Sequence, residues 1–327
     1  DRPLLLAQMP KTTAMRWDKA FDLLHDPPAW VALRRQQLWQ THFTGEALPF
    51  VRVDIGPVAL AAFLAATLHF AAAEQTTWQT PTITSWDPPP RLALLEGEPW
   101  LPQVLRLMSE LARDAQGNYL VCLPDLTGAI DALANLRNPE KLCFDLFEHR
   151  DAILAAAAQG VDAWEQVFTT MHELVLGQGV GITQWVSCWS EIPFTVPTCD
   201  FNALISPTDF QEVCLPSLRE QARRAGRCIF HLDGPAAARH APALAVTPEI
   251  TAIQFTPGAG TPSALAQLPM FRLLQHHGKP LFIECPAAEV QQVAAALDPR
   301  GLALRVSDVA TISQAEALVT WRDQAFG

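Results

Sequence analysis

The stretch between residues 228 and 307 contains four short apolar runs, CIFHLD (228–233), AIQFTP (252–257), PLFIEC (280–285) and LALRVS (302–307). A longer segment with a helical pattern follows each run. Continuous apolar runs, unlike alternating ones, are typical of strands buried on both faces. Strands that alternate with helices form a parallel sheet, in which consecutive strands are neighbours. We therefore expect these four runs to be adjacent parallel strands.

Further runs of the same kind precede this stretch. They cover residues 50–54, 82–87, 119–124 and 180–189, which brings the number of expected strands to eight. Eight strand–helix units favour a (β/α)8 TIM-type barrel over an open doubly wound sheet. We expect residues 50–327 to form this single barrel domain, with residues 1–49 as an N-terminal helical extension.

Several helix boundaries are marked in the sequence. Ser206 followed by Pro207 predicts a helix start, and Gly226 predicts the end of that helix. Residues 311–314 (TISQ) fit a capping box before a last helix. The region 129–179 is too long for one crossover, so we expect several helices there.

Composition excludes some classes of function. The chain of 327 residues carries 23 Lys and Arg against 34 Asp and Glu, a net charge of −11, which argues against nucleic-acid binding. Its seven cysteines form no CxxC pair and indicate free thiols in a reducing cytoplasm. The stretch 55–73 lacks charged side chains, yet it is short and rich in alanine. We expect a buried core helix there rather than a membrane span.

Catalytic groups of such barrels lie at the carboxyl ends of the strands. His231 and Asp233 are alternate residues near one strand end, so their side chains share a face and can grip one metal ion or one substrate. The other interpretation is structural, with the ring of His231 held by a hydrogen bond to Asp233. Cys285 ends a later strand and is either a zinc ligand or a small buried apolar residue.

Other polar residues are candidates for the same mouth. Asp200, in the loop 199–201, either faces the mouth or is a solvated loop acid. Asp54 and Asp125 either bind cationic or N–H groups of a substrate or cap the helices that follow. One or two of the tryptophans at the mouth would suit a flat apolar ligand, and we include Trp189 among the substrate-binding residues.

The order of several motifs resembles the uroporphyrinogen decarboxylase superfamily over about residues 50–320. The similar segments are HLDG (231–234), AIQFTPGAG (252–260), CDF (199–201) with ISP (205–207), and PDLTG (124–128). The resemblance implies a (β/α)8 barrel and places Gln254, within the second motif, among the substrate-binding residues. The superfamily contains decarboxylases of porphyrinogens and methyltransferases that act with corrinoids.

This sequence departs from both branches. The decarboxylases have an arginine-rich N-terminal loop, whereas the nearest basic pair here, Arg34-Arg35, lies in a predicted helix; their late Gly-His-Gly is replaced by residues 307–309 (SDV). The methyltransferases bind zinc through His-x-Cys and a later cysteine. Here His231 matches, Asp233 replaces the first cysteine, and the later ligand is either Cys285 or Asp308.

The resemblance implies a cytoplasmic enzyme that moves a methyl group between a small donor, a corrinoid or a thiol. His231, Asp233 and Asp200 would be catalytic. His231, Asp233 and Cys285 would be ligands for zinc or, as in members of the family that lack a metal, His231 and Asp233 would orient the methyl donor. A corrinoid would be a bound substrate or belong to a partner protein, and the chain would form a homodimer. The alternatives are a cofactor-free decarboxylase of a porphyrinogen or smaller acid, and a tetrapyrrole-binding protein without catalysis.

Overall fold

The four strands expected between residues 228 and 307 are confirmed in a computed structural model of the chain, which describes residues 2–10, 23–65, 68–71, 76–258 and 263–327. They are β9, β10, β11 and β12, and they pair in this order with parallel registers. In these registers His231 lies opposite Gln254, and Asp233 lies opposite Thr256. The carboxyl ends of these strands therefore share one edge of the sheet.

Two further strands extend this sheet to six in the order β2-β1-β12-β11-β10-β9. β1 is parallel to β12, and β2 is antiparallel to β1. A second sheet has the order β3-β6-β7-β8, and β4 and β5 form a separate antiparallel pair. The bounds are β1 (Leu4–Pro10), β2 (Thr41–Gly45), β3 (Phe50–Arg52), β4 (Leu68–Ala71), β5 (Thr76–Gln79), β6 (Leu120–Cys122), β7 (Ile182–Thr183), β8 (Trp189–Ser190), β9 (Ile229–Asp233), β10 (Ala252–Thr256), β11 (Leu281–Cys285) and β12 (Leu302–Val306).

At each edge of the first sheet, the neighbouring segment of the chain leads to an edge strand of the second sheet. The edge strand β2 ends at Gly45, and β3 begins the second sheet at Phe50. On the other side, the segment after β8 runs beside β9: Ile229 donates to the carbonyl of Thr195 at 3.0 Å, and His231 donates to that of Pro197 at 3.0 Å. Hydrogen bonds among the described residues do not close the sheets into one ring, so the observed class is a mixed α/β fold with mainly parallel sheets.

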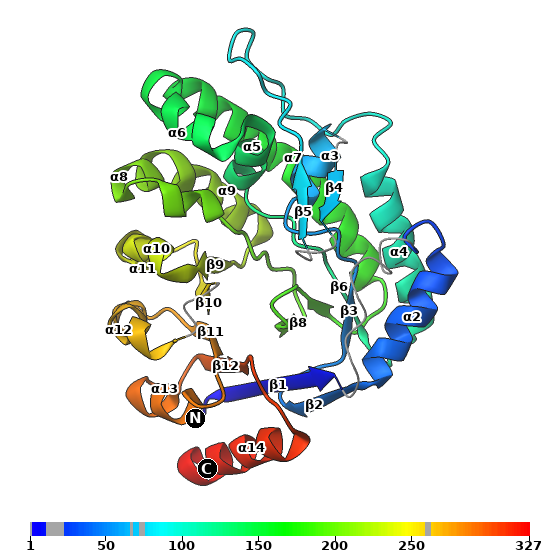
Figure 1. The fold of residues 1–327 in the computed structure, drawn as a ribbon, viewed down its shortest axis with the longest axis vertical. Coiled ribbons are helices and arrows are strands. Elements are labelled where there is room, and N and C mark those ends of the chain that lie inside the picture. The colour runs from blue at the N-terminus through cyan, green and yellow to red at the C-terminus, as the bar shows by residue number, and fades with distance from the viewer. Residues whose placement is uncertain (1, 11–22, 66–67, 72–75, 259–262) are drawn as a thin grey trace.

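Helices lie outside the strands (Figure 1). The predicted boundaries are confirmed: Ser206 and Thr311 cap helices with their side chains, and Gly226 ends α9 with a φ of 81°. The α-helices are α2 (Pro27–Trp39), α3 (Ala59–Ala65), α4 (Trp100–Ala115), α5 (Ala129–Arg137), α6 (Pro139–Glu148), α7 (Arg150–Leu176), α8 (Pro207–Asp209), α9 (Leu215–Ala225), α10 (Gly234–Ala237), α11 (Ala241–Ala245), α12 (Leu268–His276), α13 (Val290–Ala296) and α14 (Ile312–Phe326). Shorter helical turns are η1 (Asp200–Leu204), η2 (Phe210–Cys214), η3 (Ala238–His240) and η4 (Leu265–Gln267).

The strand expected at residues 82–87 is wrong. The backbone N–H groups of Thr82 and Ile83 donate to the carbonyl of Leu136 at the end of α5, at 2.8 and 2.9 Å, instead of to a strand. Three prolines follow at 88–90 and offer no N–H donor for a ladder. The strand in this part of the chain is β5, which pairs with β4.

The expectation that residues 1–49 form a helical extension before the first strand is also wrong. Only α2 is helical among the described residues of 1–49, while residues 4–10 and 41–45 are strands of the first sheet. The cause is the apolar run at the start of the chain, where Leu5, Leu6 and Ala7 are buried. A run this short and this apolar is most stable between neighbouring strands and covering helices.

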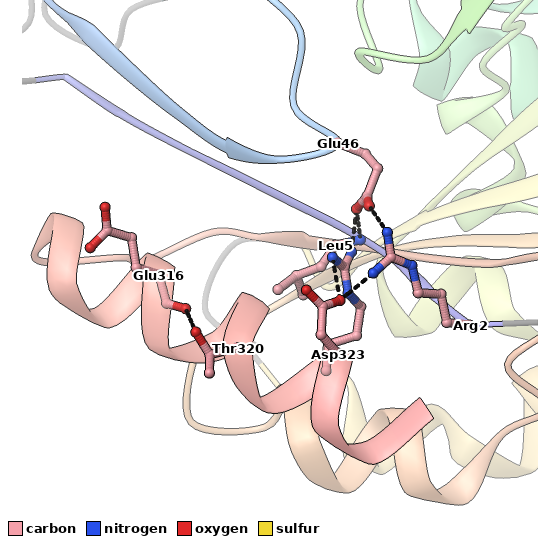
Figure 2. A network of polar contacts seen from close by, with 7 residues as sticks. Arg2, Leu5, Glu46, Glu316, Thr320 and Asp323 are labelled. Atoms are coloured by element: carbon pink, nitrogen blue, oxygen red, sulfur yellow. Dashed lines mark hydrogen bonds and ion pairs between the residues drawn. The ribbon is translucent and has the colours of Figure 1, made fainter. Parts of the chain in front are cut away.

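A polar network fastens β1 to the last helix (Figure 2). The carboxylate of Glu46 accepts the N–H of Leu5 at 2.8 Å and pairs with Arg2 at 3.4 Å and with Arg322 of α14. The side chain of Arg322 is only 3% exposed, and Asp323 pairs with it at 2.9 Å. The buried guanidinium therefore has carboxylates from two distant parts of the chain.

Within the described residues, no helix is both long enough and apolar enough to span a membrane. The stretch 55–73, expected as a buried helix, contains the buried α3 and then β4. Residues 66–67 and 72–73 of this stretch lie outside the described residues.

We expect Glu46→Ala to lower the free energy of unfolding by about 2–3 kcal/mol, because Arg322 loses a charged partner while it is buried. Arg113→Ala is the control, since Arg113 pairs with Glu110 on the surface and such pairs contribute about 0–1 kcal/mol. Urea unfolding of the two variants measures both values. Equal losses in the two variants would show that the network does not fasten the chain.

Candidate functional site

Three side chains from two segments meet at the carboxyl edge of the first sheet. They are Asp200, His231 and Asp233, and one possible ligand atom from each lies within 4.8 Å of those of the other two. His231 is buried, whereas solvent reaches both carboxylates. His231 and Asp233 are alternate residues of β9, in agreement with the expectation that their side chains share a face. Asp200 is the first residue of η1. The hydrogen bonds of residues 195–197 hold the preceding segment beside β9.

The ring of His231 is oriented by a glutamine rather than by Asp233. Its Nδ1 is hydrogen-bonded to Oε1 of Gln254, and Nε2 of Gln254 donates to Oγ1 of Thr256 at 2.9 Å. An amide oxygen only accepts, so Nδ1 carries the proton, and Nε2 keeps a lone pair for a ligand or a proton. Trp185 packs edge-on against the ring with centroids 4.8 Å apart.

The position of Asp200 depends on Asp131, a residue that the sequence reasoning missed. Asp131 lies in the first turn of α5 and is 6% exposed. Its carboxylate accepts hydrogen bonds from the hydroxyl of Thr198 at 2.6 Å and from the N–H groups of Asp200 and Phe201 at 2.9 and 3.0 Å. The available signal was a single acid within the apolar run AIDAL (129–133), where a buried charge needs several partners.

The approach of α5 to this segment also requires a glycine. A Cβ atom at Gly128 would lie 2.3 Å from the carbonyl oxygen of Thr198, a distance that no side chain tolerates. Gly128 immediately precedes α5, so the helix start can lie against the segment that carries Asp200. In the motif PDLTG (124–128), Gly128 therefore permits this close backbone approach, and Asp125 is the acid of the same motif.

The site holds carboxyl groups that resist ionisation. The carboxyl of Asp200 meets solvent on one side and protein on the others; this burial is the main cause that raises its pKa to about 8, and the charges of Asp131 and Asp233 add to it. Burial likewise raises the pKa of Asp125 to about 7 and lowers the pKa of His231. Near neutral pH the site therefore contains a protonated acid beside a neutral imidazole.

Asp54 and Asp125 both stabilise turns after their strands. Each accepts a backbone N–H two residues ahead at 2.9 Å, from Gly56 and Thr127 respectively. Asp54 also pairs with Arg52. The expected capping of the following helices is not observed for Asp125, because α5 begins after Gly128 without a side-chain cap, and Asp54 lies five residues before α3. Oδ2 of Asp125 is not used by its turn, whereas Oδ2 of Asp54 pairs with Arg52.

Two of the four non-glycine residues with positive φ in the described part of the chain lie beside the site. Thr127 after β6 and Ser187 after β7 have φ values of 58° and 65°. Non-glycine residues in this region cost about 1–3 kcal/mol each and cluster at functional sites. The turn at Ser187 brings Trp185 against His231. Nε1 of Trp185 is buried without a hydrogen-bond partner among the described residues, so it can donate to a ligand.

Three further candidates lie apart from the group of Asp200, His231 and Asp233. Cys285 is buried and outside that group, and burial raises the pKa of its thiol to about 12. Asp308 accepts the N–H of Ala287 at 2.6 Å. Trp189 is 46% exposed and donates from Nε1 to the carbonyl of Val180 at 2.9 Å. Among the described residues, the tryptophan packed against His231 is Trp185.

A cavity of about 310 Å³ adjoins the site on the side of Asp200. Its walls come from the hairpin β4–β5, from α5 and from η1. Residues that line it include Val58, Trp78, Asp131, Asn135, Asp200 and Leu204. The site therefore has a neighbouring space in which a small molecule can lie.

Asp200→Asn should stabilise the metal-free protein at alkaline pH. The folded pKa of Asp200 lies near 8, above its ordinary value of 3.8, so ionisation disfavours the folded state as pH rises from 4 to 8. The variant cannot ionise. Its melting temperature relative to the native chain, measured with a chelator present, should be almost unchanged near pH 4 and should increase towards pH 9.

Glu220→Gln is the control for this measurement. Hydrogen bonds from Arg223 lower the pKa of Glu220 to about 2, so the difference that this variant makes should be constant between pH 5 and 9. A flat difference curve for Asp200→Asn would contradict the assignment of Asp200 as a protonated acid.

The sequence matches no protein-family model and no curated protein. Among solved structures, the fold is similar to that of a methyltransferase from Methanosarcina mazei, with a TM-score of 0.61 over 100% of this chain and 94% of that chain. The two sequences are 11% identical. At this identity the likeness shows a shared α/β fold.

Proposed function

We propose that the chain is a divergent member of the uroporphyrinogen decarboxylase superfamily that transfers a methyl group with the help of a bound metal ion. The single observation that carries the proposal is the convergence of Asp200, His231 and Asp233 within 4.8 Å at the carboxyl edge of a parallel sheet. The order of the sequence motifs and the fold shared with a methyltransferase support it.

The proposal includes the barrel architecture. The two larger sheets adjoin in the chain at both edges, through residues 46–49 on one side and through the segment 195–197 beside β9 on the other. Helices surround the strands (Figure 1). Both features are those of two arcs of one (β/α)8 barrel, whose mouth is the edge that carries His231.

The residues present fit a divalent ion such as zinc. Nε2 of His231 and one oxygen each from Asp200 and Asp233 make three ligands, the number typical of catalytic zinc, which keeps a fourth position for substrate. Gln254 fixes the tautomer of His231 as metal-site partners of histidine do. When bound, zinc lowers the pKa of a thiol or hydroxyl and makes it nucleophilic at neutral pH.

The chain's own side chains would place and deprotonate the substrate. Asp125, with a pKa of about 7, is suited to accept the proton that a bound thiol or hydroxyl releases. The free N–H of Trp185 would orient the substrate next to His231. A corrinoid, free or on a partner protein, would be the other participant in methyl transfer.

Porphyrinogen decarboxylation remains the alternative, and the charge of the site disfavours it. A polycarboxylate needs several cationic partners, because each desolvated carboxylate requires one. The described mouth carries Asp54, Asp125 and Asp200, and Arg52 already pairs with Asp54.

A visible absorption band with porphyrin but no turnover would instead favour the tetrapyrrole-binding alternative.

Protein purified without chelator should contain about one zinc ion per chain, because three ligands converge at one point. His231→Ala should weaken zinc binding more than about tenfold, since one of the ligands is lost. Cys285→Ser should leave it unchanged, because Cys285 lies outside the group. Metal analysis and competition with a chelator measure both. Loss of zinc in Cys285→Ser with retention in His231→Ala would contradict the ligand set.

Asp131→Ala should weaken zinc binding about tenfold without removing a ligand, because Asp200 loses its anchor. The variant should also lose about 2–3 kcal/mol of stability through unpaired N–H groups. Asp145→Ala is the matched control: Asp145 is buried and pairs with Arg137 at 2.6 Å, so its loss destabilises the fold but leaves the site intact. Equal zinc affinity in both variants would separate Asp131 from the site.

A further inference from the structure

The cavity beside Asp200 has walls that are mainly apolar. Val58, Ala134, Phe201 and Leu204 line it, and Trp78 forms part of the wall from the hairpin β4–β5. Among its lining residues there is no lysine, arginine or histidine. An anionic ligand would therefore find no cationic partner in this space.

The two acids of the cavity are engaged with other groups of the chain. Asp131 accepts three hydrogen bonds from the segment 198–201. A ligand atom of Asp200 lies within 4.8 Å of those of His231 and Asp233, so Asp200 belongs to that group as well as to the wall of the cavity. The rest of the lining accordingly offers apolar contacts rather than charged partners.

We propose that this cavity binds a neutral, largely apolar molecule with one substituted ring, with its polar end towards Asp200. An apolar cavity of about 150 Å³ is large enough for benzene. The space here is about 310 Å³, which suits one substituted ring and is too small to enclose a tetrapyrrole. The role of this molecule as methyl donor or acceptor rests on the proposed function, whereas its binding does not.

Trp78 determines the shape of the cavity. Its ring is 51% exposed and stacks on His69 across the hairpin, with centroids 4.0 Å apart and planes inclined by 16°. Nε2 of His69 is in turn hydrogen-bonded to Thr80 at 2.8 Å. The indole is thus held as a flat wall, a geometry that favours contact with a planar ring.

Three probes with the same ring and different charge test the proposal. Benzyl alcohol, benzylamine and benzoate are titrated at pH 6.5 into zinc-free protein by calorimetry or ligand-observed NMR. Benzyl alcohol should bind most tightly of the three. Trp78→Ala should weaken its binding about fivefold or more, a loss of about 1 kcal/mol of contact. Trp39→Ala, which changes an equally exposed tryptophan of α2, should not.

Leu204→Arg is a second variant that keeps the test independent of the hairpin. Leu204 is 57% exposed, so the fold tolerates a longer side chain there. The added cation should strengthen benzoate binding about tenfold relative to the native chain.

Tighter binding of benzylamine would replace the proposal by an organic-cation site, and tighter binding of benzoate to the native chain would overturn it. Equal affinities in Trp78→Ala and the native chain, or no binding of benzyl alcohol, would also overturn it. A chain that binds benzyl alcohol through Trp78 but holds no zinc would keep this inference and lose the proposed function. Zinc binding without benzyl alcohol binding would do the reverse.

Discussion

One buried carboxylate decides whether the site exists. Asp131 belongs to α5, yet its three hydrogen bonds all go to the segment 198–201, which runs on from the strand-like residues beside β9. A buried charge without partners would be strongly unfavourable, so Asp131 holds the segment 198–201 against the first turn of α5. Asp200 is thereby carried to within 4.8 Å of His231 and Asp233.

The same arrangement explains why the site is acidic without being filled with ion pairs. Asp131 is stabilised by three hydrogen bonds, Asp54 pairs with Arg52, and Asp125 and Asp200 hold protons near neutral pH because burial raises their pKa values. Carboxyl groups with raised pKa values are poised to exchange protons or to yield them to a metal ion. The fold accepts this electrostatic cost, together with strained backbone at Thr127 and Ser187, at the place where chemistry would occur.

The late strands could be predicted from sequence because their apolar runs are continuous and regularly separated. The helix starts at Ser206 and Thr311 were equally readable, since capping is a local interaction. Failures came where a distant partner decides the outcome. The backbone of Thr82 is bonded to Leu136, and the run at Leu5 is a strand only because β12 lies beside it.

The residues of the site likewise fall into those that the sequence predicts and those that depend on distant contacts. Alternation along β9 was enough to place His231 and Asp233 on one face, and the loop acid Asp200 was named from the sequence as a candidate. The anchor Asp131, the tautomer set by Gln254 and the ring of Trp185 were not readable, because each depends on contacts between segments far apart in the chain.

The pairing of β1 with β12 has a consequence for how the chain acquires its structure. Leu4 lies opposite Ala303, so these partners are separated by about 300 residues. During synthesis from the N-terminus, β1 is available long before its parallel neighbour and exposes an apolar edge while it waits. β9, β10 and β11 pair through short connections and can form early, whereas the insertion of β1 must be a late event. Until then the network of Glu46 and Arg322 cannot assemble, and β1 has only its antiparallel neighbour β2 to pair with.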